Sequence, residues 1–96
     1  MIRSFGDRLA EALYHGLKSK ELRAFPPELR RIAARKLDMV SAATTPDDLR
    51  APPANRLEAL RGNRRGYFSI RINDQWRVVF RWEGTYADDV SVVDYH

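Results

Sequence analysis

The sequence contains no cysteine and no long apolar run, and each absence excludes a class of protein. Without thiols the chain can form neither a disulfide bond nor a metal site built on thiolates. No apolar stretch approaches the roughly 20 residues that a helix needs to cross a bilayer. The segment from Met1 to Leu13 includes acidic residues and lacks the apolar core of a signal peptide. We therefore expect a cytoplasmic protein with no membrane contact.

The balance of charge favours a polyanionic partner. The chain has 96 residues, with 17 lysines and arginines against 13 aspartates and glutamates, and a net charge of +4. This length suits one domain over residues 1–96, and an apolar content of 44% is ordinary for a globular protein. A basic domain of this size suits nucleic acid, although many small basic proteins have no such partner.

Hydrophobic spacing predicts helices in the first half of the chain. Residues 1–5 can form an edge strand, and Asp7 can cap a helix that ends at Gly16. After a polar connection over residues 17–25, Pro26 and Pro27 begin a longer helix over residues 28–43. Its apolar stripe is predicted to consist of Leu29, Ile32, Ala33, Leu37 and Val40.

The second half of the chain is predicted to form strands. One helical turn is expected at residues 45–49, and Pro52-Pro53 is expected to exclude regular structure. Strands are then expected at residues 55–60, 67–72, 76–82 and 87–94. The fold class is therefore α+β, with a small antiparallel sheet and two N-terminal helices packed on one of its faces.

A concentration of arginines marks the strands from residue 55 to residue 82. Side chains alternate in both central strands, so that aromatic and branched residues turn inward and arginines turn outward. Asn73-Asp74 between these strands fits a two-residue hairpin turn, because both residues tolerate positive φ. The outward face is predicted to bind anions. The cations of this stretch are Arg56, Arg61, Arg64, Arg65, Arg71, Arg77 and Arg81, with Arg50 just upstream.

Three polar residues with chemical potential follow the last expected strand. Asp94, Tyr95 and His96 supply an acid, a phenol and an imidazole in consecutive positions. Histidine titrates near neutral pH and suits general acid or base work, while arginines such as Arg77 can stabilise charge on a phosphate. These are the parts of a metal-independent ribonuclease, although a polar tail can also be merely frayed. Glu58 is either a general base or a partner in a surface ion pair with Arg56.

The sequence resembles the HigB family of toxins, within the RelE/ParE superfamily of bacterial type II toxin–antitoxin systems. The resemblance covers nearly the whole chain, including RLEALRG, GYFSIRINDQWRVVFRW and the closing DYH. It implies a RelE-like fold and an mRNA interferase, a hydrolase that cuts messenger RNA in the ribosomal A site without a cofactor. It also implies a cognate helix-turn-helix antitoxin similar to HigA, whose complex with the toxin binds operator DNA and represses the operon.

The resemblance also assigns roles to residues. The family's catalytic arginine falls on Arg77, and its terminal acid, tyrosine and histidine fall on Asp94, Tyr95 and His96. The basic residue in the turn after the first strand falls on Arg61. Some characterised members have histidine at the position of Glu58 and arginine at the position of Asn73. Glutamate can accept a proton but cannot offer a cation to phosphate, so the identity of the general base stays open.

Two hypotheses about function follow, an endoribonuclease and a non-catalytic binding module. In the first, Arg77 stabilises the phosphate, His96 is the acid or base, Tyr95 and Asp94 position the groups, and Glu58 is a possible base. The RNA backbone is expected to be bound by Arg56, Arg61, Arg64, Arg65 and Arg71. The rival is a non-catalytic module that binds nucleic acid or a partner and acts as a co-repressor with its antitoxin. A gyrase inhibitor, as in the ParE branch, is more distant.

Overall fold

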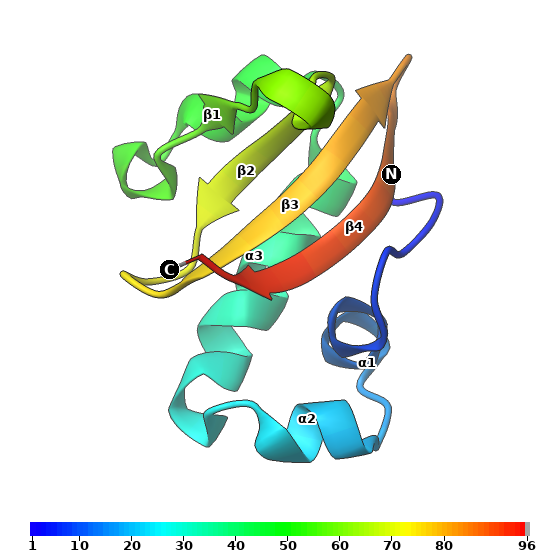
Figure 1. Cartoon of the computed structure of the whole chain (residues 1–96), viewed down its shortest axis with the longest axis vertical. Coiled ribbons are helices and arrows are strands. Elements are labelled where there is room, and N and C mark those ends of the chain that lie inside the picture. Colours follow the sequence, from blue (N-terminus) through cyan, green and yellow to red (C-terminus); the bar gives the residue numbers. More distant parts are fainter. Residues whose placement is uncertain (96) are drawn as a thin grey trace.

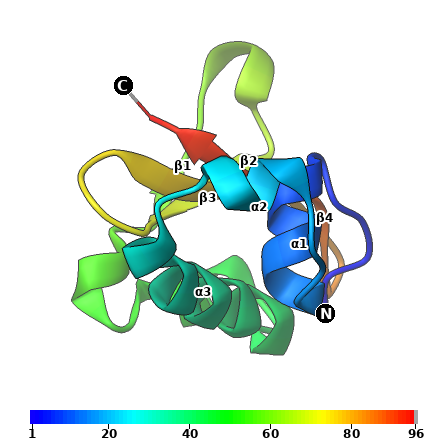
Figure 2. The same ribbon diagram turned by 90° about the horizontal axis from the view of Figure 1, so that it is seen from below.

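The computed structural model describes residues 1–95 and has the expected α+β architecture. The helices α1 (Arg8–His15), α2 (Lys20–Ala24) and α3 (Arg30–Ala42) precede the strands β1 (Glu58–Ala59), β2 (Tyr67–Arg71), β3 (Trp76–Glu83) and β4 (Tyr86–Asp94). The strands form one antiparallel sheet in the order β1-β2-β3-β4. Helix α3 passes behind the sheet in Figure 1, with α1 beside β4, and the turn at Gly62–Arg64 rises from the side opposite α3 in Figure 2. Within residues 1–95, no helix has the length and apolar character to cross a membrane.

Helix α1 is tied to the sheet by its capping residue. The Asp7 carboxylate accepts a hydrogen bond from the Ala10 amide at 2.8 Å and another from the Val92 amide of β4 at 3.2 Å. Burial raises the pKa of Asp7, while these two backbone donors oppose that rise. Gly16 ends the helix at φ 68°, a left-handed conformation that glycine adopts without steric cost. The predicted bounds of this helix are confirmed.

Helix α3 buries a narrower stripe than the sequence predicts. Ala33, Leu37 and Val40 are fully buried, as expected, and they belong to the same core as residues of the sheet. Ile32 is 37% exposed, so its predicted place in the core is wrong. The fourth buried position is Lys36. Residues 33, 36, 37 and 40 follow the i, i+3, i+4, i+7 spacing of one helix face, and Ile32 lies at its margin.

Two further local predictions are wrong. The polar connection contains α2, a short helix that begins after Ser19, whose hydroxyl accepts from the Leu22 amide at 3.0 Å. The strand expected at residues 55–60 is reduced to β1 because Pro53–Asn55 forms a 3-10 turn. Proline suits the first position of such a turn, since its fixed φ is already helical. Arg56 follows this turn in the left-handed conformation, at φ 46°.

The turn between β2 and β3 is wider than a two-residue hairpin. Arg71 pairs with Arg77, and the Ile72 amide donates to the Trp76 carbonyl at 2.9 Å. The Asn73 side chain accepts from the amides of Gln75 at 2.9 Å and Trp76 at 2.7 Å. Asparagine stabilises turns through such bonds to the backbone two and three residues on, so positive φ is not required here.

The N-terminal segment lies along the outer edge of β4. Ile2 and Phe5 make parallel bridges with Ala87 and Val90, in place of a regular edge strand. The Gly6 amide donates to the Val90 carbonyl at 2.8 Å. A Cβ atom at Gly6 would lie 2.8 Å from the carbonyl oxygen of Asp89, so this close approach requires glycine.

Candidate functional site

Arg77 lies on the sheet face that the helices leave uncovered, and its side chain is held by several neighbours. Its side chain is only 9% exposed although it lies on the outward face of β3. The Nε atom donates to the Ser69 hydroxyl at 2.9 Å, and Nη2 donates to the Arg56 carbonyl at 2.6 Å. Two of the three guanidinium nitrogens are therefore held in place, which fixes the plane of the cation before any ligand arrives.

The remaining nitrogen of Arg77 faces a polar pocket, here called the Arg77 pocket. Nη1 lies 3.6 Å from Oε1 of Glu58, and the Arg77 Cζ atom lies 5.3 Å from the centroid of the Tyr95 ring. The pocket has a volume of about 270 Å³ and is lined by Arg56, Glu58, Arg71, Asn73, Asp74, Arg77 and Tyr95. A fixed cation, a carboxylate acceptor and an aromatic face can together bind a phosphate ester and accept a proton from it.

Tyr95 is positioned by the backbone beyond the end of β4. Its amide donates to the Gln75 carbonyl at 2.6 Å, which extends the pairing that joins Trp76 to Asp94. The Asp94 carboxylate accepts from Nε2 of Gln75 at 2.8 Å. Asp94 therefore lies next to the Arg77 pocket, where it is hydrogen-bonded to Gln75. His96 lies outside the described residues.

The predicted RNA-binding arginines divide into two groups. Arg56 and Arg71 line the Arg77 pocket. Arg64 lines an adjoining depression with Val93, Asp94 and Tyr95. Arg61 and Arg65 are exposed on either side of the Gly62–Arg64 turn, outside the Arg77 pocket. Two of the five arginines therefore lie at the Arg77 pocket, and three lie in or beside the Gly62–Arg64 turn.

The acids near this site do not pair as the sequence suggested. The ion-pair partner of Glu58 among the described residues is Arg77, whereas Arg56 precedes β1 at a positive φ and contributes its carbonyl to Arg77. Asp74 forms an ion pair with Arg71.

On the far side of the sheet, burial lowers the pKa of Lys36, and the cations Arg35 and Arg71 lower it further. Among residues 1–95, no three His, Asp or Glu side chains are grouped to hold a metal ion.

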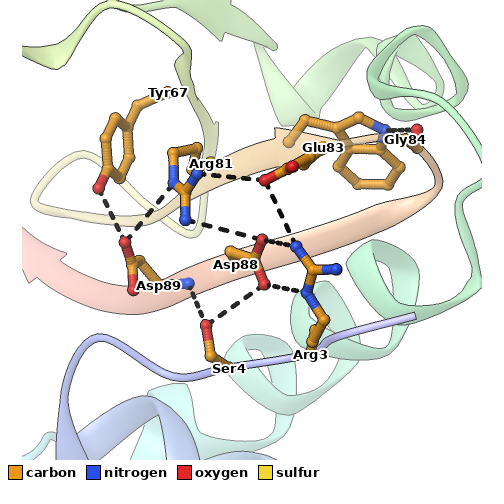
Figure 3. Close-up of polar contacts among 9 residues, drawn as sticks. Arg3, Ser4, Tyr67, Arg81, Glu83, Gly84, Asp88 and Asp89 are labelled. Carbon is orange, nitrogen blue, oxygen red and sulfur yellow. Dashed lines mark hydrogen bonds and ion pairs between the residues drawn. The ribbon is translucent and has the colours of Figure 1, made fainter.

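Arg81 is separated from the Arg77 pocket by its partners. Figure 3 shows Arg3 and Arg81 among Glu83, Asp88 and Asp89, a group here called the N-terminal charge cluster. The Arg3 Nε atom donates to Oδ1 of Asp88 at 2.8 Å, and Arg81 lies 3.7 Å from both Asp88 and Asp89. Arg77 therefore has one acid nearby, Glu58, whereas Arg81 lies within 4 Å of three acids and its charge is more completely neutralised.

The N-terminal charge cluster predicts a pH dependence of stability. The hydrogen bond from Arg3 is the main cause that lowers the pKa of Asp88, with the charges of Arg3 and Arg81 in support and burial in opposition. The unfolded state therefore binds more protons near the ordinary aspartate pKa of about 3.9, so this stabilisation is complete above that pH. It is lost as the pH falls through the lower pKa of the folded state.

We expect the difference in unfolding free energy between wild type and Asp88→Asn to shrink as the pH falls from 7 to about 3. Urea unfolding at each pH measures this difference. Asp38→Asn is the control, because Asp38 is exposed on α3, away from the cluster. A difference that is constant across the pH range would contradict the assignment.

Several contributors to the Arg77 pocket are absent from the sequence prediction. Ser69 is fully buried and accepts from Arg77, Gln75 anchors both Asp94 and Tyr95, and Asn73 lines the pocket. Ser69 could have been found, because the alternation in β2 places it on the same face as Arg71. The Arg56 carbonyl and Gln75 carry no such signal, since their roles depend on turns whose shape the pattern does not specify.

Comparisons with known proteins agree on a family of small bacterial toxins. A family model described as the RelE-like toxin of type II toxin–antitoxin system HigB matches residues 3–96. Toxin HigB-1 of Vibrio cholerae serotype O1 is 40% identical over 82 residues, covering 85% of this chain and 84% of that protein. An uncharacterized protein of Haemophilus influenzae is 42% identical over 65 residues, covering 68% of this chain and 64% of that protein.

Solved structures share the fold over the whole chain. The YoeB–YefM complex from Staphylococcus aureus matches with a TM-score of 0.62 and 18% identity, over 100% of this chain and 98% of that chain. A heterotetrameric YoeB–YefM toxin–antitoxin complex from the same organism matches with a TM-score of 0.62 and 17% identity. At these identities the structural likeness concerns the fold, and the sequence matches carry the family.

Proposed function

Because this chain belongs to the HigB-like family of RelE-like toxins of type II toxin–antitoxin systems, we propose that it is an endoribonuclease that cuts messenger RNA on the ribosome. The observation that carries this proposal is the Arg77 guanidinium. Two of its nitrogens are fixed by Ser69 and Arg56, and the third faces a pocket that contains a carboxylate. Such a preorganised cation suits the charge that develops on a phosphate during cleavage.

The reaction requires no group beyond the RNA and the protein side chains. The 2′-oxygen of a ribose attacks the adjacent phosphorus as a base accepts its proton. The bond between phosphorus and the 5′-oxygen breaks, and an acid protonates that oxygen. The products are a 2′,3′-cyclic phosphate and a 5′-hydroxyl end. Arg77 stabilises the negative charge on the phosphoryl oxygens during this displacement.

Proton transfer is assigned to Glu58 and His96. Glu58 lies 3.6 Å from Arg77 and is half exposed, so its carboxylate can meet a ribose hydroxyl beside a phosphate bound to Arg77. His96 takes the complementary role of acid, or of base if Glu58 serves only to balance Arg77 in the absence of RNA. Tyr95 orients the phosphate or a base, and Asp94 holds Gln75 and the end of β4.

The surrounding arginines are proposed to bind the RNA backbone without reading sequence. Arg56 and Arg71 act beside the scissile phosphate, and Arg61, Arg64 and Arg65 act further along the strand. Contacts of this kind release counterions and therefore weaken as salt increases. Selection of translated message would then come from the ribosomal A site, where the mRNA is presented.

We also propose a cognate antitoxin as the regulatory partner. This proposal is supported by the family description, which is of a toxin in a toxin–antitoxin system, and by the two solved structures named above, which are YoeB–YefM complexes. A helix-turn-helix antitoxin similar to HigA would hold the toxin inactive in the cytoplasm and bind operator DNA with it.

The test is to induce the protein and map the 5′ ends of cellular transcripts. A reporter message is expected to acquire new 5′-hydroxyl ends inside its coding region. An otherwise identical message without a ribosome-binding site is the matched control and is expected to stay intact. If translated messages remain uncut, the endonuclease proposal fails.

The pairing of Arg77 with Glu58 also suits a second candidate, a non-catalytic co-repressor, because an ion pair at the centre of the pocket offsets the charge of the cation. That candidate predicts operator binding with the antitoxin and no new 5′ ends.

Removal of the Tyr95 ring is expected to slow cleavage by about five-fold. The ring covers Arg77 at 5.3 Å, and a cation–π contact of this kind contributes about 1 kcal/mol. Tyr95→Phe keeps the ring and is expected to retain most of the activity, whereas Tyr95→Ala is not. The rate of reporter cleavage in a cell-free translation reaction measures both. Equal rates for Tyr95→Ala and wild type would exclude a role for the ring.

A further inference from the structure

A second depression on the same sheet face is related to the Arg77 pocket through an intermediate depression that shares lining residues with each. It has a volume of about 480 Å³, and Tyr67, Val79, Asp89 and Val93 are among its lining residues. Tyr95 lines both the Arg77 pocket and an intermediate depression, and Arg64 and Val93 line both that depression and this one. The second depression is here called the Asp89 groove, and it adjoins the Arg77 pocket through these shared residues.

Asp89 is held with one carboxylate oxygen available to a ligand. Its backbone has φ 52°, at a bulge where Val79 pairs with Ser91 and Arg81 pairs with Asp88. The Tyr67 hydroxyl donates to Oδ2 at 3.0 Å, and Arg81 approaches the same oxygen at 3.7 Å. Within residues 1–95, Oδ1 accepts no hydrogen bond, and the side chain is 45% exposed. Figure 3 shows Asp89 between Tyr67 and Arg81.

Beside Asp89 this groove suits a nucleobase, whereas Arg64, which also lines it, suits the RNA backbone. A carboxylate repels phosphate, and it accepts hydrogen bonds from the amino groups on base edges. Val79 and Val93 supply apolar surface, and Tyr67 supplies an aromatic ring beside it. Residues two apart on a strand are about 7 Å apart, so Val79 is one short step along β3 from Arg77. A base next to the phosphate at Arg77 can therefore reach the groove.

We propose that the Asp89 groove binds the nucleobase adjacent to the phosphate at Arg77 and selects bases that carry an exocyclic amino group. The inference rests on the proposed function, because it names the base that accompanies the cleaved phosphate. Asp89 accepts from the amino group of cytosine, adenine or guanine. Where cytosine carries its amino group, uracil carries a carbonyl oxygen, which the Asp89 carboxylate repels.

Cytosine and uracil provide the sharpest test, because they have the same size and differ at this one edge. The probes are two trinucleotides, all-cytosine and all-uracil, with 2′-O-methyl groups that prevent cleavage. Binding to the full-length protein is followed by NMR at the amides of Asp89 and Ser91. The all-cytosine probe is expected to bind about ten-fold more tightly, the size of one base-edge contact.

Asp89→Asn is expected to remove the preference and bind the two probes about equally, because a carboxamide both donates and accepts. Asparagine tolerates positive φ, so the backbone at this position is retained. Asp38→Asn makes the same charge change on α3 and is expected to keep the preference. If the wild-type protein binds the two probes equally, or if the amide signals of Asp89 and Ser91 do not shift, the proposed base subsite is wrong. Neither result bears on cleavage. Uncut messages after induction would instead remove the proposed function and leave a measured base preference standing.

Discussion

Replacement of Arg77 by lysine is expected to reduce mRNA cleavage by about 10²- to 10³-fold, the usual cost of one preorganised donor to a developing anion. Lysine keeps the positive charge but cannot donate to Ser69 and Arg56 while presenting a further nitrogen to the pocket. The ammonium group would also be free to rotate, so the direction of the donor would be lost. Counting 5′ ends on a translated reporter measures the effect.

Two comparisons separate this catalytic effect from a loss of folding. Arg35→Ala removes one exposed cation from α3, and it is expected to cleave at the wild-type rate. Thermal unfolding of Arg77→Lys must show a folded protein at the assay temperature. Arg77→Ala is less informative, since it leaves Ser69 and the Arg56 carbonyl without their buried donor, at a cost of about 1–3 kcal/mol. Wild-type cleavage by folded Arg77→Lys would remove Arg77 from the mechanism.

Asn55→Leu is expected to lower the free energy of unfolding by about 3 kcal/mol. Asn55 is fully buried, and its carbonyl accepts from the buried ammonium of Lys36. Its amide donates to the carbonyls of Leu49 at 3.2 Å and Ala51 at 3.5 Å. Leucine would leave a buried cation without its partner and two carbonyls without a donor. Urea unfolding measures the loss.

The partner variant isolates the Lys36–Asn55 contact. Lys36→Met alone leaves the Asn55 carbonyl unpaired, while the double variant removes both groups together. We expect the double variant to be more stable than the sum of the single effects predicts, by about 1–3 kcal/mol, because no unpaired charge remains. Strict additivity would show that the contact contributes nothing. Asn55→Leu should also slow cleavage, since the next residue, Arg56, supplies the carbonyl that fixes Arg77.

The outward face of the sheet is electrostatically divided, and this division shapes the proposed site. Arg77 and Arg81 lie on the same strand and face, four residues apart. Arg77 has one acid at 3.6 Å, whereas Arg81 lies within 4 Å of Glu83, Asp88 and Asp89. We therefore expect a phosphate to be attracted to the Arg77 end of β3 and a hydrogen-bond donor to the acids at the Arg81 end. This is the arrangement that a nucleotide, with its anionic backbone and its base, would require.

Local periodicity in the sequence was enough to predict much of this fold. Alternation placed Phe80 in the core and Arg77 on the opposite face, and the Asp7 cap and Gly16 stop bounded α1 correctly. These features depend on neighbours within about four residues, which a sequence pattern reports directly. Residue type was a poorer guide on α3, where the apolar Ile32 lies exposed at the margin of the buried face and the charged Lys36 lies within that face.

By itself, the sequence determined the α+β fold, the family and the strand that carries Arg77. Only the tertiary structure decided which groups surround that arginine. Glu58 meets Arg77 across 19 residues of chain and Arg56 lends its carbonyl across 21, while Asp88 reaches Arg3 across 85. Such pairs depend on strand register and on turns such as the one at Arg56, whose positive φ no alternation pattern encodes. The physical reason is that charge acts through space, and the distances that set its strength are fixed by the packing of distant segments.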